Sequence, residues 1–348
     1  MEPHRDRLRR RPAAGDRLLT APDPDPDPDP DGLGPFLAHR AEMIGLAYRM
    51  TGSLALAEDV AQDAFLRWRA ADRAAVRDAR SVLLTIAARL CLDQLRSARA
   101  RREHYVGVWL PEPVIDDDAA PQEAALARRQ DLSVAILLAL QRLSPVERAI
   151  VILHDVFDLP FAEIAPMVGR SATACRKAAG RARARLHDTP MPDTTAPDTI
   201  MPNTITLDTA GAARLTDAFY RAVQQGDIDT LRTLLAEDAV AYTDGGGLRP
   251  AALNPIRGRE KLLRLFAGLA ARKPGPAKLL YRGPVNALPG YVTQEADGLP
   301  QTTALEWRNE GHGSRIATIY IVRNPQKLGH LAAIAPIPWA FIPWAPIP

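Results

Sequence analysis

Apolar residues recur at the three- to four-residue spacing of amphipathic helices through most of the first half of the chain. Polar breaks such as Thr51-Gly52-Ser53 separate these runs. After about residue 210, helical runs give way to stretches in which β-branched and aromatic residues partly alternate with polar ones, which is typical of strands. The pattern predicts helices over 36–50, 54–68, 81–95, 145–157, 159–168, 171–186, 212–227, 228–238 and 256–271, and strand-like runs over 277–294, 301–309 and 314–324.

Changes in composition divide the chain into segments. A basic start followed by "DPDPDPDPD" has nothing to bury and predicts an extended, disordered spacer. We expect two all-α domains followed by a separate α+β domain with a curved antiparallel sheet. The predicted boundaries are 1–34 for the spacer, 35–102 for the first helical domain, 103–124 for a linker, 125–187 for the second helical domain, 188–208 for a Pro/Asp/Thr linker, 209–331 for the α+β domain and 332–348 for a Pro/Trp-rich tail.

The second helical domain carries the start and stop signals of three successive helices. Ser144 as N-cap with Glu147 three residues later predicts a capping box, and Pro145 suits the first helical position. Gly169 ends the next helix, and Ser171 caps the last. This layout is a helix-turn-helix, in which the last helix lies in the major groove of DNA.

The last of these helices is strongly basic. Residues 161–186 contain six cations and one anion, a net charge of +5, whereas the whole chain carries only +3. Pro166 inside the preceding helix predicts a kink or a helix of one turn. A solvated basic face on an ordinary helical bundle stays open as an alternative. The candidate DNA-binding residues here are Arg170, Ser171, Thr173, Arg176, Lys177 and Arg181.

Cysteine and histidine usage predicts neither a disulfide scaffold nor a metal site. Cys91 and Cys175 lie far apart outside any CxxC motif, and the histidines form no HExxH spacing. We therefore expect no cofactor and a reducing compartment. The N-terminus lacks an apolar signal segment, and five prolines interrupt the last 18 residues, so we expect a cytoplasmic protein without a membrane span.

Several stretches resemble a known family. "AYRMTGSLALAEDVAQDAFLRW" and "LLTIAARLCLDQLRSARARRE" closely resemble region 2 of the extracytoplasmic-function sigma factors of bacterial RNA polymerase. "LSPVERAIVILHDVFDLPFAEIAPMVGRSATACRKAAGRARARL" resembles their region 4. "YVGVWLPEP", "DGGG" and "NPQKL" are similar to motifs of the sigma factors with a fused SnoaL-like C-terminal domain. The resemblance spans about 36–331 and implies a region 2 helical bundle, a region 4 helix-turn-helix and a cone-shaped curved sheet.

The resemblance also implies roles for region 2. The acidic helix face of region 2 would meet the clamp helices of the polymerase β′ subunit, and the third helix of region 2 would bind the minus-10 element. Region 4 would meet the β flap. Without the resemblance, a solvated acidic face is the simpler interpretation. The polymerase-binding candidates are Glu58, Asp59, Gln62 and Asp63, the DNA-binding candidates are Asp93, Gln94, Arg96 and Arg99, and the expected core residues are Phe65, Leu66, Trp68, Leu83, Leu84, Ile86 and Leu90.

The "VWLPEP" segment is unusual for a flexible linker, because a Trp-Leu pair precedes two prolines that hold the backbone extended. We interpret it as a docking segment, against either the C-terminal domain or region 2. The glycines at 245–247 allow a tight turn, which would place Asp244 and Tyr242 near the mouth of the cone. The interdomain and regulatory candidates are Trp109, Leu110, Pro111, Asp244, Gly245, Asn324, Pro325 and Lys327.

The predicted function is that of an alternative sigma factor, not an enzyme. It would join core RNA polymerase, read the minus-35 element with region 4 and melt and read the minus-10 element with region 2, while the C-terminal domain regulates it in cis. An anti-sigma factor and a small-molecule ligand of the SnoaL-like domain are further possible partners. Two alternatives stay open: a SnoaL-like isomerase or hydrolase on a DNA-binding scaffold, which would want an Asp–His pair, and a DNA-binding repressor. The tail could pack in a groove, bind a partner or lie at a membrane interface.

Overall fold

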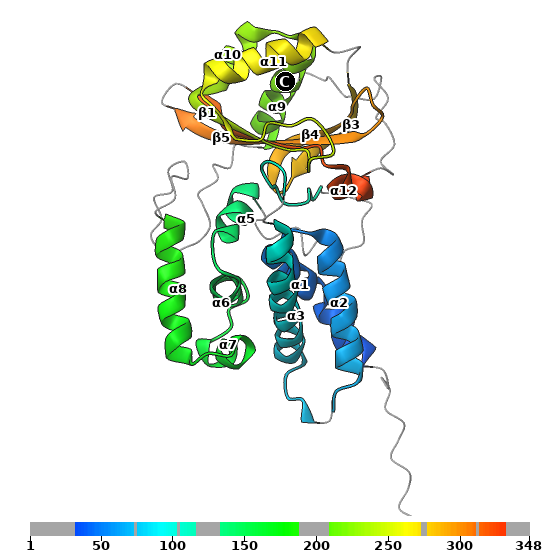
Figure 1. Ribbon diagram of the computed structural model, residues 1–348, viewed down its shortest axis with the longest axis vertical. Coiled ribbons are helices and arrows are strands. Elements are labelled where there is room, and N and C mark those ends of the chain that lie inside the picture. Colours follow the sequence, from blue (N-terminus) through cyan, green and yellow to red (C-terminus); the bar gives the residue numbers. More distant parts are fainter. Residues whose placement is uncertain are drawn as a thin grey trace, which may run out of the picture.

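The computed structural model describes residues 32–72, 75–102, 105–115, 133–187, 209–272, 277–310 and 313–331 (Figure 1). Most of the predicted N-terminal spacer, the linker of 188–208, His312 and the Pro/Trp-rich tail lie outside these residues. The first helical group consists of α1 (Leu33–Thr51), α2 (Leu54–Arg69) and α3 (Ala79–Arg102), as the periodicity predicts. Helix α1 begins before the predicted boundary at residue 35, because the Trp68 indole of α2 donates to the carbonyl of Gly32 at 2.8 Å and fixes its start.

The second helical group consists of α5 (Val134–Gln141), α6 (Pro145–Asp155), α7 (Phe161–Val168) and α8 (Ala172–His187). The capping box of Ser144 and Glu147, the end of α7 at Gly169 and the cap of α8 by Ser171 are confirmed. Of the two alternatives predicted at Pro166, a kink or a one-turn helix, the one-turn helix is wrong, since α7 runs for eight residues through the proline. The proline removes the usual partner of the Ala162 carbonyl, but Ala162 is exposed and water can serve instead.

The two helical groups share a single apolar core. Buried side chains from α1 to α3, such as Met50 and Leu84, and from α5 to α8, such as Ile150 and Ile164, belong to one continuous cluster. Helix α3 packs against both α6 and α7. The two groups therefore form one packed unit in this structure (Figure 1).

The C-terminal domain combines helices with a six-stranded sheet. Its helices are α9 (Thr209–Gln225), α10 (Ile228–Leu234) and α11 (Arg259–Arg272), and a short α12 (Pro325–Leu328) runs into a 3-10 turn at Gly329–Leu331. The strands are β1 (Leu235–Asp244), β2 (Ile256–Arg257), β3 (Lys278–Val285), β4 (Leu288–Gln294), β5 (Pro300–Glu310) and β6 (Gly313–Val322), in the order β2-β1-β6-β5-β4-β3. The α+β prediction is confirmed.

Three details of this domain differ from the prediction. The helix expected over 228–238 ends at Leu234, because residues from Leu235 onward pair with β6 in the sheet. That pair is parallel, so the sheet is not wholly antiparallel as expected. The run 277–294 is a hairpin of two strands, since Asn286 and Ala287 both adopt positive φ and form a two-residue turn.

Alternating residues give the sheet two faces with different coverings. The helix-covered face presents side chains such as Leu305 and Ile319 to Phe219 of α9 and Phe266 of α11. The linker-covered face presents Ala304 and Tyr320 to other segments, which include Leu110, Val134 of α5 and Leu331. Figure 1 shows α10 and α11 on one side of the sheet and α5 on the other. None of the described helices has the length and apolar content that a membrane crossing needs.

Candidate nucleic-acid interface, polymerase interface and interdomain joint

Helix α8 presents one face to solvent and buries the other. Cys175, Ala178, Ala179 and Ala182 are buried against the helices before it, since small side chains allow close packing. The predicted DNA-binding residues of this helix and of the turn before it are all exposed: Arg170, Ser171, Thr173, Arg176, Lys177 and Arg181. The Arg176 guanidinium also lies 5.8 Å from the centre of the Phe161 ring. This face provides donors and positive charge in the arrangement that a helix-turn-helix needs.

Two arginines counted in the basic run of α8 are engaged within the protein. Arg183 forms a bidentate ion pair with Asp155 of α6. Arg185 pairs with Glu147 at 2.9 Å. Burial raises the pKa of Glu147, but hydrogen bonds from Ser144 and the charge of Arg185 outweigh it, so the pKa lies below its usual value. These arginines hold α8 on α6, and the exposed basic face is smaller than the sequence count suggests.

Helix α2 carries the acidic face that the sequence predicts. Glu58, Asp59, Gln62 and Asp63 are all exposed. Leu66, which was expected in the core, is 58% exposed. It follows Asp59, Gln62 and Asp63 at helical spacing, so it extends their face instead of the buried one. The other expected core residues of this region are buried or half-buried.

Helix α3 places the minus-10 candidates near its end. Asp93 and Arg96 are exposed and form an ion pair with each other at 3.1 Å, and Gln94 is half-buried. Position 99 lies on the same helix, but its side chain is outside the described atoms. Arg89, on the face shared with Arg96, donates to the carbonyl of Pro166 in α7 at 3.0 Å.

Polar contacts join the two helical groups around their shared core. Ser81 of α3 donates to Glu163 of α7 at 3.1 Å, and Arg80 donates to the carbonyl of Phe157 at 3.3 Å. The buried guanidinium of Arg148 donates to the carbonyls of Leu140 and Met50, which end helices of different groups. The minus-10 and minus-35 candidates thus lie on one packed unit.

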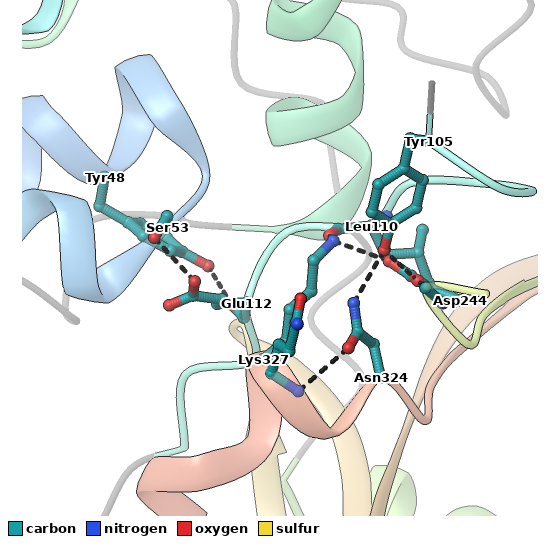
Figure 2. A network of polar contacts seen from close by, with 10 residues as sticks. Tyr48, Ser53, Tyr105, Leu110, Glu112, Asp244, Asn324 and Lys327 are labelled. Atoms are coloured by element: carbon teal, nitrogen blue, oxygen red, sulfur yellow. Dashed lines mark hydrogen bonds and ion pairs between the residues drawn. The ribbon is translucent and has the colours of Figure 1, made fainter. Parts of the chain in front are cut away.

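The linker is bound by a buried carboxylate of the C-terminal domain (Figure 2). Asp244 has no solvent exposure and accepts hydrogen bonds from the Tyr105 hydroxyl at 2.5 Å and the Leu110 amide at 2.8 Å. Lys327 lies 2.7 Å from the same carboxylate and donates to the Leu110 carbonyl. Burial and the neighbouring Asp244 raise the pKa of Tyr105, so this phenol stays a donor. Asn324 caps α12 and donates to the Tyr105 hydroxyl at 3.0 Å.

The same linker also contacts the first helical group, so contacts of both predicted kinds occur together. The Trp109 ring lies over Gly52, where an added Cβ would come within 2.3 Å of it, and it also faces the Lys327 ammonium at 4.3 Å. Glu112 accepts from the Ser53 hydroxyl at 2.7 Å (Figure 2). Pro111 is buried between these contacts. We call this set of contacts the interdomain joint; its members are Tyr48, Ser53, Tyr105, Trp109, Leu110, Glu112, Asp244, Asn286, Asn324 and Lys327.

A hairpin tip of the C-terminal domain completes the interdomain joint. The Asn286 side chain donates to the Tyr48 hydroxyl of α1 at 2.6 Å and accepts from the Val114 amide at 3.2 Å. Its own amide donates to the Val114 carbonyl at 2.7 Å. Tyr48 donates in turn to the Glu112 carbonyl at 2.6 Å. Three parts of the chain therefore share one buried polar network.

Asp244 ends β1, and its carboxylate faces the linker. Its described partners include no histidine. Gly245 is required for close approach, since a Cβ there would lie 2.1 Å from the Arg249 carbonyl, whereas only Gly246 and Gly247 have positive φ. Within the described ranges, no three His, Cys, Asp or Glu side chains gather as a metal site would require. No described contact favours the isomerase or hydrolase alternative.

Comparison with known proteins places these features in a family. The family models described as "Sigma-70 region 2" and "Sigma-70, region 4" match residues 36–101 and 133–186. The chain is 36% identical over 301 residues to the ECF RNA polymerase sigma factor SigJ of Mycobacterium tuberculosis, covering 84% of this chain and 91% of that protein. It is 35% identical over 302 residues to the probable ECF RNA polymerase sigma factor SigI of the same species, covering 85% and 94%.

A solved structure extends the similarity to the whole arrangement. The crystal structure of the Mycobacterium tuberculosis extracytoplasmic function sigma factor SigJ matches with a TM-score of 0.66 and 32% sequence identity. The match covers 85% of this chain and 98% of that one. It therefore includes the C-terminal α+β domain as well as the two helical groups.

Proposed function

Because the chain belongs to the extracytoplasmic-function sigma factors, we propose that its SnoaL-like domain regulates promoter recognition in cis by holding the linker and keeping regions 2 and 4 together. The protein binds core RNA polymerase and directs promoter-specific transcription initiation. The regulatory role is our inference, and the observation that carries it is the fully buried Asp244, which binds linker backbone and side chain at once. We place this action in the cytoplasm with the polymerase, and assign the domain no reaction of its own.

The closed arrangement cannot read both promoter elements together. By their names the minus-10 and minus-35 elements lie ~25 base pairs apart, which is ~85 Å at ~3.4 Å per base pair. Here the Arg89 side chain of region 2 contacts the Pro166 carbonyl of region 4 at 3.0 Å, and both regions share a core. The two regions must therefore separate before α3 and α8 can occupy their elements.

The SnoaL-like domain opposes this separation by contacting both regions. It binds region 2 through Asn286 and Tyr48, and it covers Val134 and Leu138 of α5 in region 4 with its linker-covered face. It also binds the linker between them through Asp244 and Lys327. We propose the acidic face of α2 as the polymerase contact, α8 as the minus-35 reader, and Asp93, Gln94, Arg96 and Arg99 as minus-10 contacts.

The test removes the buried ion pair without leaving a lone buried charge. In the full chain, Asp244→Ala with Lys327→Met abolishes both partners, because breaking only one would leave an uncompensated charge. Asp238→Asn serves as the matched control, since Asp238 pairs with Arg308 on the exposed surface of the same domain. Hydrogen exchange of residues 105–115 reports linker release, and in vitro transcription with core polymerase reports activity.

We expect faster exchange in the linker and a higher transcript yield for the double variant, with neither change in the control. A released linker with an unchanged yield would overturn regulation through the joint. A linker that stays protected would show that Asp244 and Lys327 do not hold it.

A further inference from the structure

Helix α2 lacks one half of the capping box that α6 has. In α6 the N-cap Ser144 donates its hydroxyl to Glu147 at 2.7 Å, and Glu147 also accepts from the Ser144 amide. In α2 the N-cap is Ser53, whose hydroxyl accepts from the Leu56 amide at 3.2 Å. The position that would carry the acidic partner is Leu56, and the first turn of α2 contains no acidic residue.

The linker brings a carboxylate to this end of α2 from 59 residues away. Glu112 accepts from the Ser53 hydroxyl at 2.7 Å, the same distance as in the box of α6. Its other oxygen accepts from the Leu54 amide at 2.6 Å. The Glu112 amide donates to the Gly52 carbonyl at 2.9 Å, so the backbone of the linker is fixed at the same point. A negative charge here also opposes the positive end of the helix dipole.

We propose that Glu112 is a positioning residue for polymerase binding, which caps the first turn of α2 only while the linker is docked. The first turn of α2 leads directly into the turn that carries Glu58 and Asp59. Uncapped amides let the first turn of a helix fray. Whether the linker is docked then determines how well ordered the polymerase-binding face of α2 is. This inference rests on the proposed assignment of that face to polymerase.

The joint therefore has two functions with opposite effects on activity. Contacts of the linker with Asp244 and Lys327 oppose the separation of regions 2 and 4. The contact of Glu112 with Ser53 and Leu54 lies wholly between the linker and region 2, and it supports the helix that meets polymerase. A linker freed from the SnoaL-like domain but still seated on Gly52 and Ser53 would be the active form.

The test uses a rescue that bypasses the linker. In the full chain, Glu112→Ala removes the distant carboxylate, and Leu56→Glu in that background places a carboxylate in the first turn of α2, at the position that Glu147 has in α6. Glu260→Ala is the matched control, because Glu260 is an exposed acidic residue paired with Arg232 in the C-terminal domain. Hydrogen exchange of a peptide covering residues 53–57 measures the protection of the amides at the start of α2. The Kd for core polymerase measures the effect on binding through the acidic face.

We expect Glu112→Ala to speed exchange at residues 54–56 about fivefold, the factor for a cap of about 1 kcal/mol, and to weaken polymerase binding by a similar factor. Leu56→Glu should restore both without returning the linker. Unchanged exchange in Glu112→Ala would overturn the cap. Faster exchange with unchanged polymerase binding would overturn the positioning role.

A separate variant distinguishes failure of the underlying assignment. Asp59→Asn with Asp63→Asn removes charge from the face and leaves the capping residues intact. If that variant binds core polymerase as well as the parent does, the assignment of the acidic face of α2 to polymerase binding is wrong. The exchange result still decides whether Glu112 caps α2.

Discussion

The two faces of the SnoaL-like sheet are built from the same strands but are covered from different parts of the chain. The helix-covered face packs against α9 to α11, which belong to the same domain. The linker-covered face packs against segments as distant as Leu110, whose carbonyl accepts from Lys327 217 residues later. One face therefore folds the domain, and the other connects it to the sigma regions.

The chemistry of the two faces differs accordingly. The helix-covered face is closed largely by apolar contacts, including an edge-to-face pair of Phe219 and Phe266 at 5.6 Å. The linker-covered side adds a buried ion pair, a buried Asn and a buried Glu to its apolar contacts. When a surface opens, polar groups can replace their protein partners with water. A wholly apolar face gains no such hydrogen bonds, so its exposure to water costs more free energy. The comparison predicts that the faces can be weakened separately.

The largest effect is expected on the helix-covered face. Phe266→Ala leaves a cavity beside Phe219 and should lower the free energy of unfolding of the C-terminal domain by about 3–5 kcal/mol. Leu269→Ala on the same helix is the control, because Leu269 is exposed and should change it by less than about 0.5 kcal/mol. Hydrogen exchange of β5 and β6 measures the change in unfolding free energy that each variant causes. Equal effects of the two variants would contradict the assignment of this face as the folding core.

A smaller effect with a different location is expected from Leu110→Ala. Leu110 is fully buried in the linker-covered cluster, and its truncation should weaken linker docking by about 2–3 kcal/mol. Exchange should rise in residues 105–115 and stay unchanged at the centres of β5 and β6. Val106→Ala, at an exposed linker position, is the control. A matching rise in β5 and β6 would mean that the two faces do not act separately.

The helices and the α+β character could be predicted from the sequence because local signals specify them. Ser144, Glu147 and Gly169 act on neighbours within a few residues, so their caps can be found without knowing the fold. The hairpin of β3 and β4 was missed because Asn286-Ala287 replaces the glycine that usually marks such a turn. Leu66 was misplaced because an apolar residue on a helix can extend a binding face as well as a core.

The interdomain joint could be predicted only in part. The Trp-Leu pair before two prolines indicated docking, and Asp244, Asn324 and Lys327 belonged to recognisable motifs. Tyr48, Ser53, Tyr105, Glu112 and Asn286 were missed as site residues. Their partners lie between 57 and 238 residues away in the chain, and no periodicity relates them. Such pairs follow from the packing of domains, which single-sequence patterns do not contain.

Asn286→Gly should weaken the joint less than Leu110→Ala does. Glycine keeps the positive φ of the turn but removes the bonds to the Tyr48 hydroxyl and the Val114 amide. We expect a loss of about 1–2 kcal/mol in docking, seen as faster exchange in residues 110–115. Ala287→Gly is the control at the next position, because Ala287 is exposed. Equal effects would show that the turn backbone, and not the Asn286 side chain, makes the contact.

The smallest expected effect depends on pH and concerns Glu306 on the linker-covered face. Its carboxyl accepts from the Tyr320 hydroxyl at 3.0 Å and is almost fully buried. Burial raises its pKa above the usual value near 4.5, although hydrogen bonds from Thr318 and Tyr320 oppose the rise. The folded state therefore holds this proton more tightly than the unfolded chain does, and its contribution to stability falls as pH rises through the window above 4.5.

Glu306→Gln should remove that decline, because the amide keeps the acceptor oxygen and cannot ionise. Unfolding measured from pH 4.5 upward should then show a flatter profile, with a gain in stability at neutral pH. Asp238 has the opposite pH dependence, because Arg308 lowers the pKa of Asp238 and its contribution to stability is lost as pH falls. Asp238→Asn should therefore remove a loss of stability at low pH. An unchanged slope in Glu306→Gln would mean that the carboxyl stays hydrated in solution, and the linker-covered face would then be open to water even while the linker is docked.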